Sequence, residues 1–338
     1  MEELLKVRNL KTYFFDKKKT IKAVDGVDFK INKGETLALV GESGCGKSMT
    51  SLSIMQLVPA PYGKIVEGEV VLEGKNLLDY SENEMCKVRG NEISMIFQEP
   101  MTSLNPVMTI GEQIIEVITY HKRLPRKKAV QQAIDLLKLV GIPRAESIIT
   151  EYPHRLSGGM RQRVMIAMAM SCDPKLLIAD EPTTALDVTI QAQILDLMKD
   201  LSKKVNTSIL LITHDLGVVS ELAERVIVMY AGQIVEQASV GDIFDEPLHP
   251  YTQGLVESVP DIDGEIGRLN PIKGNVPTPD NMPKGCRFAP RCAHAFDRCF
   301  SEEPQLQEKK YGTRTVRCFL YDDDKGAENA RKDQYSHR

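Results

Sequence analysis

The sequence predicts an α/β fold, because short apolar runs of strand length alternate with segments of helical periodicity. Three such runs, at residues 37–40, 176–179 and 208–212, end directly in glycine, carboxylate or Thr-His-Asp sequences. The first is followed by Gly-Glu-Ser-Gly-Cys-Gly-Lys-Ser at 41–48 and then by a helical segment. Strand, glycine-rich turn and helix in this order are typical of a P-loop, so we predict a P-loop NTPase core rather than a chance glycine-rich turn.

The residue types of this loop suit phosphate. Its three glycines permit backbone turns that side chains would block, so N–H groups and the following helix N-terminus can converge on phosphate oxygens. Lys47 is predicted to reach the β- and γ-phosphates, and Ser48 to offer its hydroxyl to Mg²⁺. The predicted nucleotide contacts of the loop are Gly41, Ser43, Gly44, Cys45, Gly46, Lys47, Ser48 and Met49.

Three further sites follow the P-loop along the chain. Ser157-Gly158-Gly159 stands at the start of a helical segment, where free N–H groups, a hydroxyl and a positive helix end suit a second phosphate site. Asp180 and Glu181 end the second apolar run; neighbouring strand residues point to opposite faces, so we expect different roles for them. His214 follows the third run. A lone strand-end histidine is usually structural, but this position favours a functional one.

The ordered set of motifs resembles the ATP-binding cassette (ABC) family over residues 1 to about 250. The resemblance implies a RecA-like core, an N-terminal antiparallel β sub-domain and an inserted helical sub-domain. The motifs that carry it are Walker A at 41–48, a glutamine loop at Gln98, the signature at 156–160, Walker B at 176–180 with Glu181, a D-loop at Ala185-Leu-Asp187 and a switch His214.

The resemblance implies a role for each residue in ATP hydrolysis. Asp180 would hold Mg²⁺ with Ser48, and Glu181 would polarise the attacking water, because a metal-bound carboxylate accepts a proton poorly. Gln98 would lie near the metal and the water and sense the γ-phosphate. His214 would hydrogen-bond the γ-phosphate or the water and lock the transition-state geometry.

The resemblance also implies a pair of cassettes. A site made from one chain would leave Ser157, Gly158 and Gly159 without a ligand. In the family, subunits pair head to tail, and the signature of one closes over the P-loop nucleotide of the other. Two ATP molecules are then held between the subunits, and Asp187 would cross the interface.

A narrower resemblance is to the D-type ATPase subunits of bacterial dipeptide and oligopeptide importers. It rests on residues 96–106, on the signature ending in Met-Arg-Gln-Arg at 160–163, and on a cysteine-bearing C-terminal extension. It implies an unlike ATPase subunit or a second copy as partner, two membrane permease subunits, and indirectly an extracellular peptide-binding protein. Two alternatives stay open: a soluble cassette ATPase acting on ribosomes or DNA, and import of nickel or another small solute.

Four segments are expected. The ATPase core takes 1–98 and 154–250, with a helical sub-domain at 99–153 whose clearest helices are 110–120 and 129–140. A C-terminal extension at 251–321 begins as a linker rich in Pro, Gly and Asn, and 322–338 is expected to be a disordered charged tail. Net charge is −4, which gives no sign of a nucleic-acid surface. No run is long enough to span a bilayer, so any membrane must be reached through a partner. The resemblance to importer ATPases implies a peripheral position on the cytoplasmic face of the membrane.

An aromatic side chain upstream of the P-loop is expected to stack on adenine. Tyr13, Phe14 and Phe15 are adjacent candidates, and strand alternation sends Phe14 to the opposite face from the other two. Matching the Asn9-Leu10 frame to the family favours Phe14. The alternative is that all three are ordinary core aromatics.

Cysteine positions give a second signal. Cys45, Cys86 and Cys172 are scattered, which is typical of inert thiols, whereas four cysteines lie in the C-terminal extension with five, six and eighteen residues between them. Disulfides do not suit a reduced compartment, so we predict a four-cysteine metal site. Its members are Cys286, Cys292, Cys299 and Cys318.

The metal is predicted to be a [4Fe–4S] cluster rather than Zn²⁺. The Cys-x₂-Cys knuckles of zinc ribbons are absent, and nearby arginines can offset an anionic cluster. Extensions of the resembled importers are associated with iron–sulfur binding. Unliganded thiols are the third option. We expect this site to be distant from the P-loop, so that Cys292→Ser leaves ATP binding largely intact.

Overall fold

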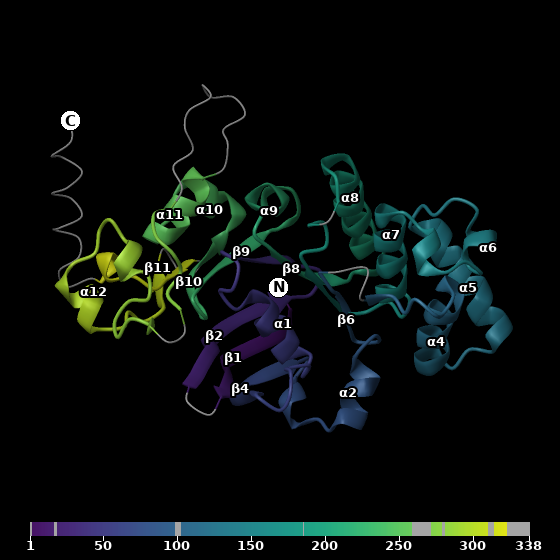
Figure 1. Ribbon diagram of the computed structural model, residues 1–338, viewed down its shortest axis with the longest axis horizontal. Helices are drawn as coiled ribbons and strands as arrows, with labels where there is room; N and C mark the ends of the chain where they lie inside the picture. Colours follow the sequence, from purple (N-terminus) through teal and green to yellow (C-terminus); the bar gives the residue numbers. More distant parts are fainter. Residues whose placement is uncertain are drawn as a thin grey trace.

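The computed structural model describes residues 2–16, 19–98, 103–184, 186–258, 272–278, 281–309 and 314–322. These residues form two sheets, as Figure 1 shows. A four-stranded antiparallel sheet has the order β2-β1-β4-β5, and an eight-stranded sheet has the order β11-β12-β10-β9-β3-β8-β7-β6. The predicted α/β class and the N-terminal antiparallel sub-domain are confirmed. Most of the expected tail and much of the expected linker lie outside the described residues.

The strands follow the apolar runs of the sequence. The antiparallel sheet contains β1 (Glu3–Asp16), β2 (Lys19–Asn32), β4 (Gly63–Leu72) and β5 (Lys75–Asn76). The larger sheet contains β3 (Thr36–Val40), β6 (Ile93–Ile96), β7 (Leu176–Asp180), β8 (Ser208–Thr213), β9 (Arg225–Tyr230), β10 (Gln233–Ser239), β11 (Gln307–Lys309) and β12 (Arg314–Val316).

Helices cover these sheets. They are α1 (Lys47–Ile54), α2 (Glu82–Val88), α4 (Ile110–Lys122), α5 (Arg126–Leu139), α6 (Ala145–Ile148), α7 (Gly158–Ala169), α8 (Val188–Val205), α9 (Leu216–Leu222), α10 (Val240–Asp245), α11 (Pro250–Glu257) and α12 (Asp297–Ser301). Short 3₁₀ turns are η1 (Leu77–Asp79), η2 (Pro153–Arg155), η4 (Ala289–Arg291) and η5 (Phe319–Tyr321). No helix of the described residues is long and apolar enough to cross a membrane.

The parallel part of the larger sheet is buried on both faces. Along β7, Leu176 and Ile178 pack with α1 and the antiparallel sheet, whereas Leu177 and Ala179 pack with α7 and α8. Successive side chains of a strand alternate between the two faces of the sheet. A strand that is buried on both faces therefore needs a continuous apolar run. The P-loop follows β3 and Glu181 follows β7, so both begin at the end of a buried strand.

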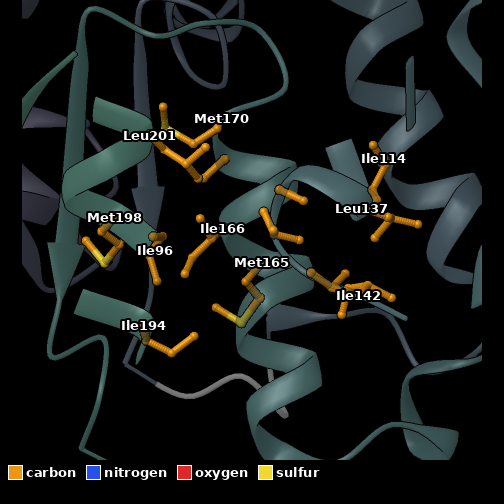
Figure 2. Close-up of a cluster of buried hydrophobic side chains, with 14 of the residues drawn as sticks. Ile96, Ile114, Leu137, Ile142, Met165, Ile166, Met170, Ile194, Met198 and Leu201 are labelled. Carbon is orange, nitrogen blue, oxygen red and sulfur yellow. The ribbon is translucent and has the colours of Figure 1, made fainter. Parts of the chain in front are cut away.

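The predicted helical segment is confirmed at its two clearest helices, α4 and α5. Thr109 caps α4 by accepting from the Glu112 N–H at 3.2 Å, while the Glu112 carboxylate accepts from the Thr109 N–H at 2.8 Å. Ile114 of α4 and Leu137 of α5 pack against one core with Met165 of α7 (Figure 2). Helices α4 to α6 lie at one end of the molecule, and the C-terminal segment with α12 lies at the other (Figure 1).

The C-terminal extension joins the ATPase sheet, which the sequence did not predict. Strand β12 pairs with β10 through Glu236 with Val316 and Gln237 with Thr315. Next to this pairing, the buried Arg314 guanidinium lies 3.3 Å from the buried Glu236 carboxylate. The extension is therefore part of the same folded body as the P-loop.

Candidate functional site

The P-loop joins β3 to α1 through tight backbone contacts. Gly46 caps α1 with φ of 107°, and a Cβ there would lie 2.4 Å from the Ala23 carbonyl oxygen. At Gly41, φ is 150° and a Cβ would lie 2.2 Å from the Met229 carbonyl oxygen. Any side chain at either position would displace a neighbouring strand, so the loop shape depends on these two glycines.

Lys47 and Ser48 are the first two residues of α1, directly after the P-loop turn. The Lys47 ammonium donates to the Gly41 carbonyl at 2.7 Å and to the Glu42 carbonyl at 3.1 Å, which folds the side chain back over the loop. The Ser48 hydroxyl donates to the Asp180 carboxylate at 3.0 Å. Burial raises the pKa of Asp180, against the Ser48 hydrogen bond and the Lys47 charge. A buried carboxylate beside a hydroxyl is a donor set that fits Mg²⁺.

Glu181 lies beyond the end of β7, with φ of 46°. The side chains of Asp180 and Glu181 are therefore separated by a left-handed turn at Glu181. The alternation along one strand that the sequence predicted is wrong as the cause of this separation. One Glu181 oxygen accepts from Gln98 Nε2 at 2.9 Å and from Thr184 Oγ1 at 3.0 Å. The other lies 3.1 Å from Nδ1 of His214. The structure thus brings together Gln98, Glu181 and His214.

A cavity of about 630 Å³ lies between this carboxylate cluster and the P-loop. Glu181, His214 and Gln98 line one part of it, and Gly41 and Ser43 line another. Leu255 and Ile272, which lie beyond the core boundary predicted from the sequence, also line it. The cavity is large enough for phosphates, a metal ion and water. Thr184 is a further residue of this cluster that the sequence pattern does not predict, because its contact with Glu181 depends on the turn at Glu181.

The signature residues lie elsewhere. Ser157 caps α7, and its hydroxyl accepts from the Met160 N–H at 3.3 Å. Ser157 and Gly158 are exposed, and neither they nor Gly159 are among the described residues that line the cavity. The Asp187 side chain caps α8 by accepting from the Ile190 N–H at 3.0 Å. Within the described chain the Ser-Gly-Gly motif therefore presents its helix start to solvent.

The adenine candidates separate as alternation predicts. Tyr13 donates to the Asp25 carboxylate, and its ring centroid lies 6.5 Å from that of Phe15. Phe14 packs near Gly63. Cys45 is buried in the apolar core, and Met49 is partly buried against it. Both side chains therefore help to pack the loop and the following helix.

The four C-terminal cysteines line one small cavity, with a volume of about 20 Å³. All four are free thiols. Burial raises the pKa of Cys292 to about 11 and that of Cys318 to about 12, so both thiols are neutral as they stand. Burial also raises the pKa of Cys286, and nearby backbone groups oppose the rise in pKa at Cys286, Cys292 and Cys318. In the described ranges no group of three or more Cys, His, Asp or Glu side chains is arranged to hold a metal.

The expected distance between the cysteines and the P-loop is wrong. Arg291, which precedes Cys292, forms two hydrogen bonds to the Glu42 carboxylate at 2.7 and 3.0 Å. Arg287, which follows Cys286, pairs with Asp25 and donates to the Ala231 carbonyl at 2.6 Å. No local pattern predicts these contacts, because Arg291 and Glu42 are 249 residues apart.

The P-loop, the Ser48 and Asp180 pair and the Glu181 cluster together define an ATPase of the ABC class. A family model for ABC transporters matches residues 24–184, and a model for the oligopeptide/dipeptide transporter C-terminal region matches 235–299. The chain belongs to the family of ATP-binding proteins of oligopeptide and dipeptide ABC transporters.

Two relatives illustrate this membership. The oligopeptide transport ATP-binding protein AppD of Bacillus subtilis (strain 168) is 69% identical over 330 residues, which cover 98% of this chain and 100% of AppD. The dipeptide transport ATP-binding protein DppD of the same organism is 50% identical over 95% of this chain and 96% of DppD.

Solved structures agree with the fold. The dimeric, post-hydrolysis ATP-binding cassette MJ0796 bound to ADP and phosphate has a TM-score of 0.63 and 28% identity, and it covers 70% of this chain and 99% of its own. A second match, cbiO1 from Clostridium perfringens, has a TM-score of 0.62 and 27% identity over 73% of this chain and 92% of its own. The similarity covers the cassette, and about a quarter of the chain lies outside it.

Proposed function

We propose that the protein hydrolyses Mg-ATP to drive uptake of dipeptides or oligopeptides through membrane permease subunits. The observation that carries the proposal is the Glu181 carboxylate, held by three side chains at the cavity beside the P-loop. This arrangement fixes a base where a water can approach the γ-phosphate. Peptides are proposed as the cargo because relatives similar along almost the whole chain are named as oligopeptide and dipeptide transport proteins.

Each site residue has a proposed role. Lys47 leaves the two loop carbonyls and binds the β- and γ-phosphates, while Ser48 and Asp180 hold Mg²⁺ with Gln98 beside it. Glu181 orients and deprotonates the water, and His214 binds the γ-phosphate. For adenine we propose Phe14, with Tyr13 and Phe15 as the alternatives. We propose the same nucleotide contacts in the loop as the sequence predicts, namely Gly41, Ser43, Gly44, Cys45, Gly46, Lys47, Ser48 and Met49.

The second phosphate site is proposed to act on a partner. Ser157, Gly158 and Gly159 present an exposed helix start, so they can bind the nucleotide of another cassette. That cassette is an unlike ATP-binding subunit or a second copy, and Asp187 lies at the contact. ATP then binds across the interface, and hydrolysis lets the cassettes separate.

The proposed domain plan assigns transport coupling to the helices. Residues 99–153 would dock on two permease subunits and so hold the protein on the cytoplasmic face of the membrane. An extracellular binding protein would deliver the peptide.

One experiment distinguishes this proposal from the alternatives expected from the sequence, which are action on ribosomes or DNA and import of nickel. The purified complex should contain two membrane permeases, and peptides rather than Ni²⁺ should stimulate its ATPase in the presence of the binding protein. Isolation with ribosomes or DNA and without permeases would contradict the proposal.

We also propose that Cys286, Cys292, Cys299 and Cys318 bind one metal centre, a [4Fe–4S] cluster, with Zn²⁺ as the alternative. The four thiols line one cavity, and nearby backbone groups oppose the rise in pKa that burial causes at three of them, which would favour anionic sulfur. The thiols must lose protons to bind, so the metal would supply the free energy that burying thiolates costs. It would serve as a structural staple, which requires no redox reaction.

The metal proposal predicts a coloured protein. Protein purified without oxygen should be brown, with broad absorption in the visible blue and iron and sulfide in equal amounts. Cys292→Ser should bleach it, whereas Cys86→Ser, the matched control outside the extension, should not. Colourless protein with one equivalent of zinc would reject iron–sulfur and keep the staple. Metal-free protein with a protease-resistant extension would reject both.

A further inference from the structure

We propose that Arg291 is a positioning residue for the phosphate loop, and that its ion pair with Glu42 couples the four-cysteine extension to ATP binding. The inference rests on the assignment of residues 41–48 as the ATP site. It gives the extension a function in nucleotide binding, beyond being a folded appendage. Three sets of contacts carry it: those around the guanidinium, those around Glu42, and those that join Arg291 to the cysteine turn.

The Arg291 guanidinium is held in one orientation. It forms a bidentate pair with Glu42, its Nε donates to the Lys273 carbonyl at 3.0 Å, and its side chain is 4% exposed. The rings of Tyr230 and Phe288 lie 5.8 and 5.9 Å from the guanidinium carbon. Bidentate pairs of this kind fix geometry as well as charge.

Glu42 is fixed at every polar group. Its N–H donates to the Tyr251 hydroxyl at 2.8 Å, and its carbonyl accepts from the Lys47 ammonium at 3.1 Å and from the Cys45 N–H at 3.2 Å. The carboxylate is held by Arg291 alone among these contacts. Glu42 therefore contacts the extension through its side chain and Lys47 through its backbone carbonyl.

The other end of the link is the cysteine turn. Arg291 is the last residue of η4, its N–H donates to the Phe288 carbonyl at 2.9 Å, and the next residue, Cys292, donates its N–H to the Ala289 carbonyl at 3.2 Å. A change in the position of Cys292 must therefore change where the guanidinium lies. Arg287, placed next to Cys286, forms a second link, because it pairs with Asp25 on the strand that packs against Gly46.

Charge makes the link matter for ATP. Without Arg291, the Glu42 carboxylate would stand unpaired on the loop that receives the triphosphate and would repel it. Coupling between two sites is reciprocal, so an ordered extension that favours ATP binding must itself be stabilised by ATP. Coupling free energies of this type change affinity by roughly 5- to 150-fold.

The test measures ATP affinity of the full chain by calorimetry. Arg291→Ala should weaken binding about tenfold, within the range that couplings of this kind span. Arg298→Ala is the matched control, since Arg298 precedes Cys299 but its ion pairs to Glu302 and Asp322 stay in the C-terminal segment. The double variant Glu42→Gln with Arg291→Ala should regain most of the loss, because the unpaired carboxylate is gone. A general loss of folding would give no such rescue.

Hydrogen exchange tests the reciprocal effect. In the wild-type protein ATP should slow backbone exchange over residues 286–292, and Glu42→Gln should abolish this protection while the extension stays folded. Unchanged affinity in Arg291→Ala, or full protection of 286–292 in Glu42→Gln, would overturn the inference. Absence of ATP binding by the wild-type protein would instead reject the proposed function, so the two failures are distinct.

Discussion

Glu181→Gln is expected to bind ATP with nearly unchanged affinity and to hydrolyse it about 10²- to 10⁴-fold more slowly, the range that a positioned general base contributes. An amide has almost the shape of the carboxylate, so the hydrogen bonds from Gln98 and Thr184 can be partly kept while the proton acceptor is lost. The measurements are the single-turnover hydrolysis rate and the equilibrium binding of Mg-ATP. Because the product state is not reached, the paired cassettes should accumulate with ATP bound.

Lys47→Ala provides the contrast. The ammonium contacts phosphate in the ground state and the transition state alike, so its loss should weaken binding and hydrolysis together. Hydrolysis by Glu181→Gln within a few-fold of the wild-type rate would remove Glu181 from the mechanism and leave the water to His214 or to solvent. Loss of binding in both variants would show that the carboxylate supports the loop rather than the reaction.

Ser157→Arg is expected to abolish turnover at the P-loop of the partner subunit while its own P-loop still binds ATP. The hydroxyl caps an exposed helix start, and a long cationic side chain there would block the approach of a second nucleotide. Loss of positioned donors to a phosphate in a closed site costs roughly 10² to 10³ in rate. The measurement is ATP hydrolysis by mixed cassettes, each carrying one defined lesion.

The mixture separates action in trans from action in cis. In the first mixture this chain carries Ser157→Arg and its partner carries a disabled P-loop lysine. In the head-to-tail arrangement both lesions then fall on the same composite site. The other site, formed by the P-loop of this chain and the signature of the partner, stays intact. This mixture should therefore hydrolyse ATP if one intact site is enough for turnover. In the second mixture both lesions lie in this chain, so both composite sites are damaged. Higher activity with both lesions in this chain than with the lesions divided between the two subunits would reject the trans arrangement.

The nucleotide motifs could be predicted from the sequence because local spacing determines them. A glycine loop between a buried strand and a helix fixes Lys47 and Ser48 within a few residues, and in the structure both lie at the start of α1. The role of the turn at Glu181 could not be predicted, because a left-handed φ at a glutamate has no sequence signal of its own. The same limit applies to Thr184, whose contact depends on that turn.

The contacts of the extension could not be predicted for a different reason. Pairing of β12 with β10 and the ion pair of Arg291 with Glu42 join residues far apart in the chain, and no local periodicity specifies them. The sequence predicts an extension whose cysteine site is distant from the P-loop. Ion pairs and strand addition bind it to the core instead, so the expected independence of Cys292 from ATP binding is replaced by the coupling proposed above.

The strand β12 has a consequence for how the molecule tolerates shortening. It covers the hydrogen-bonding edge of β10, which would otherwise offer free N–H and C=O groups to any passing strand. Ending the chain at residue 250, where the resemblance to a plain cassette stops, would uncover that edge and also remove Arg314 from the buried Glu236 carboxylate. A cassette truncated at residue 250 is therefore expected to self-associate through the exposed edge of β10.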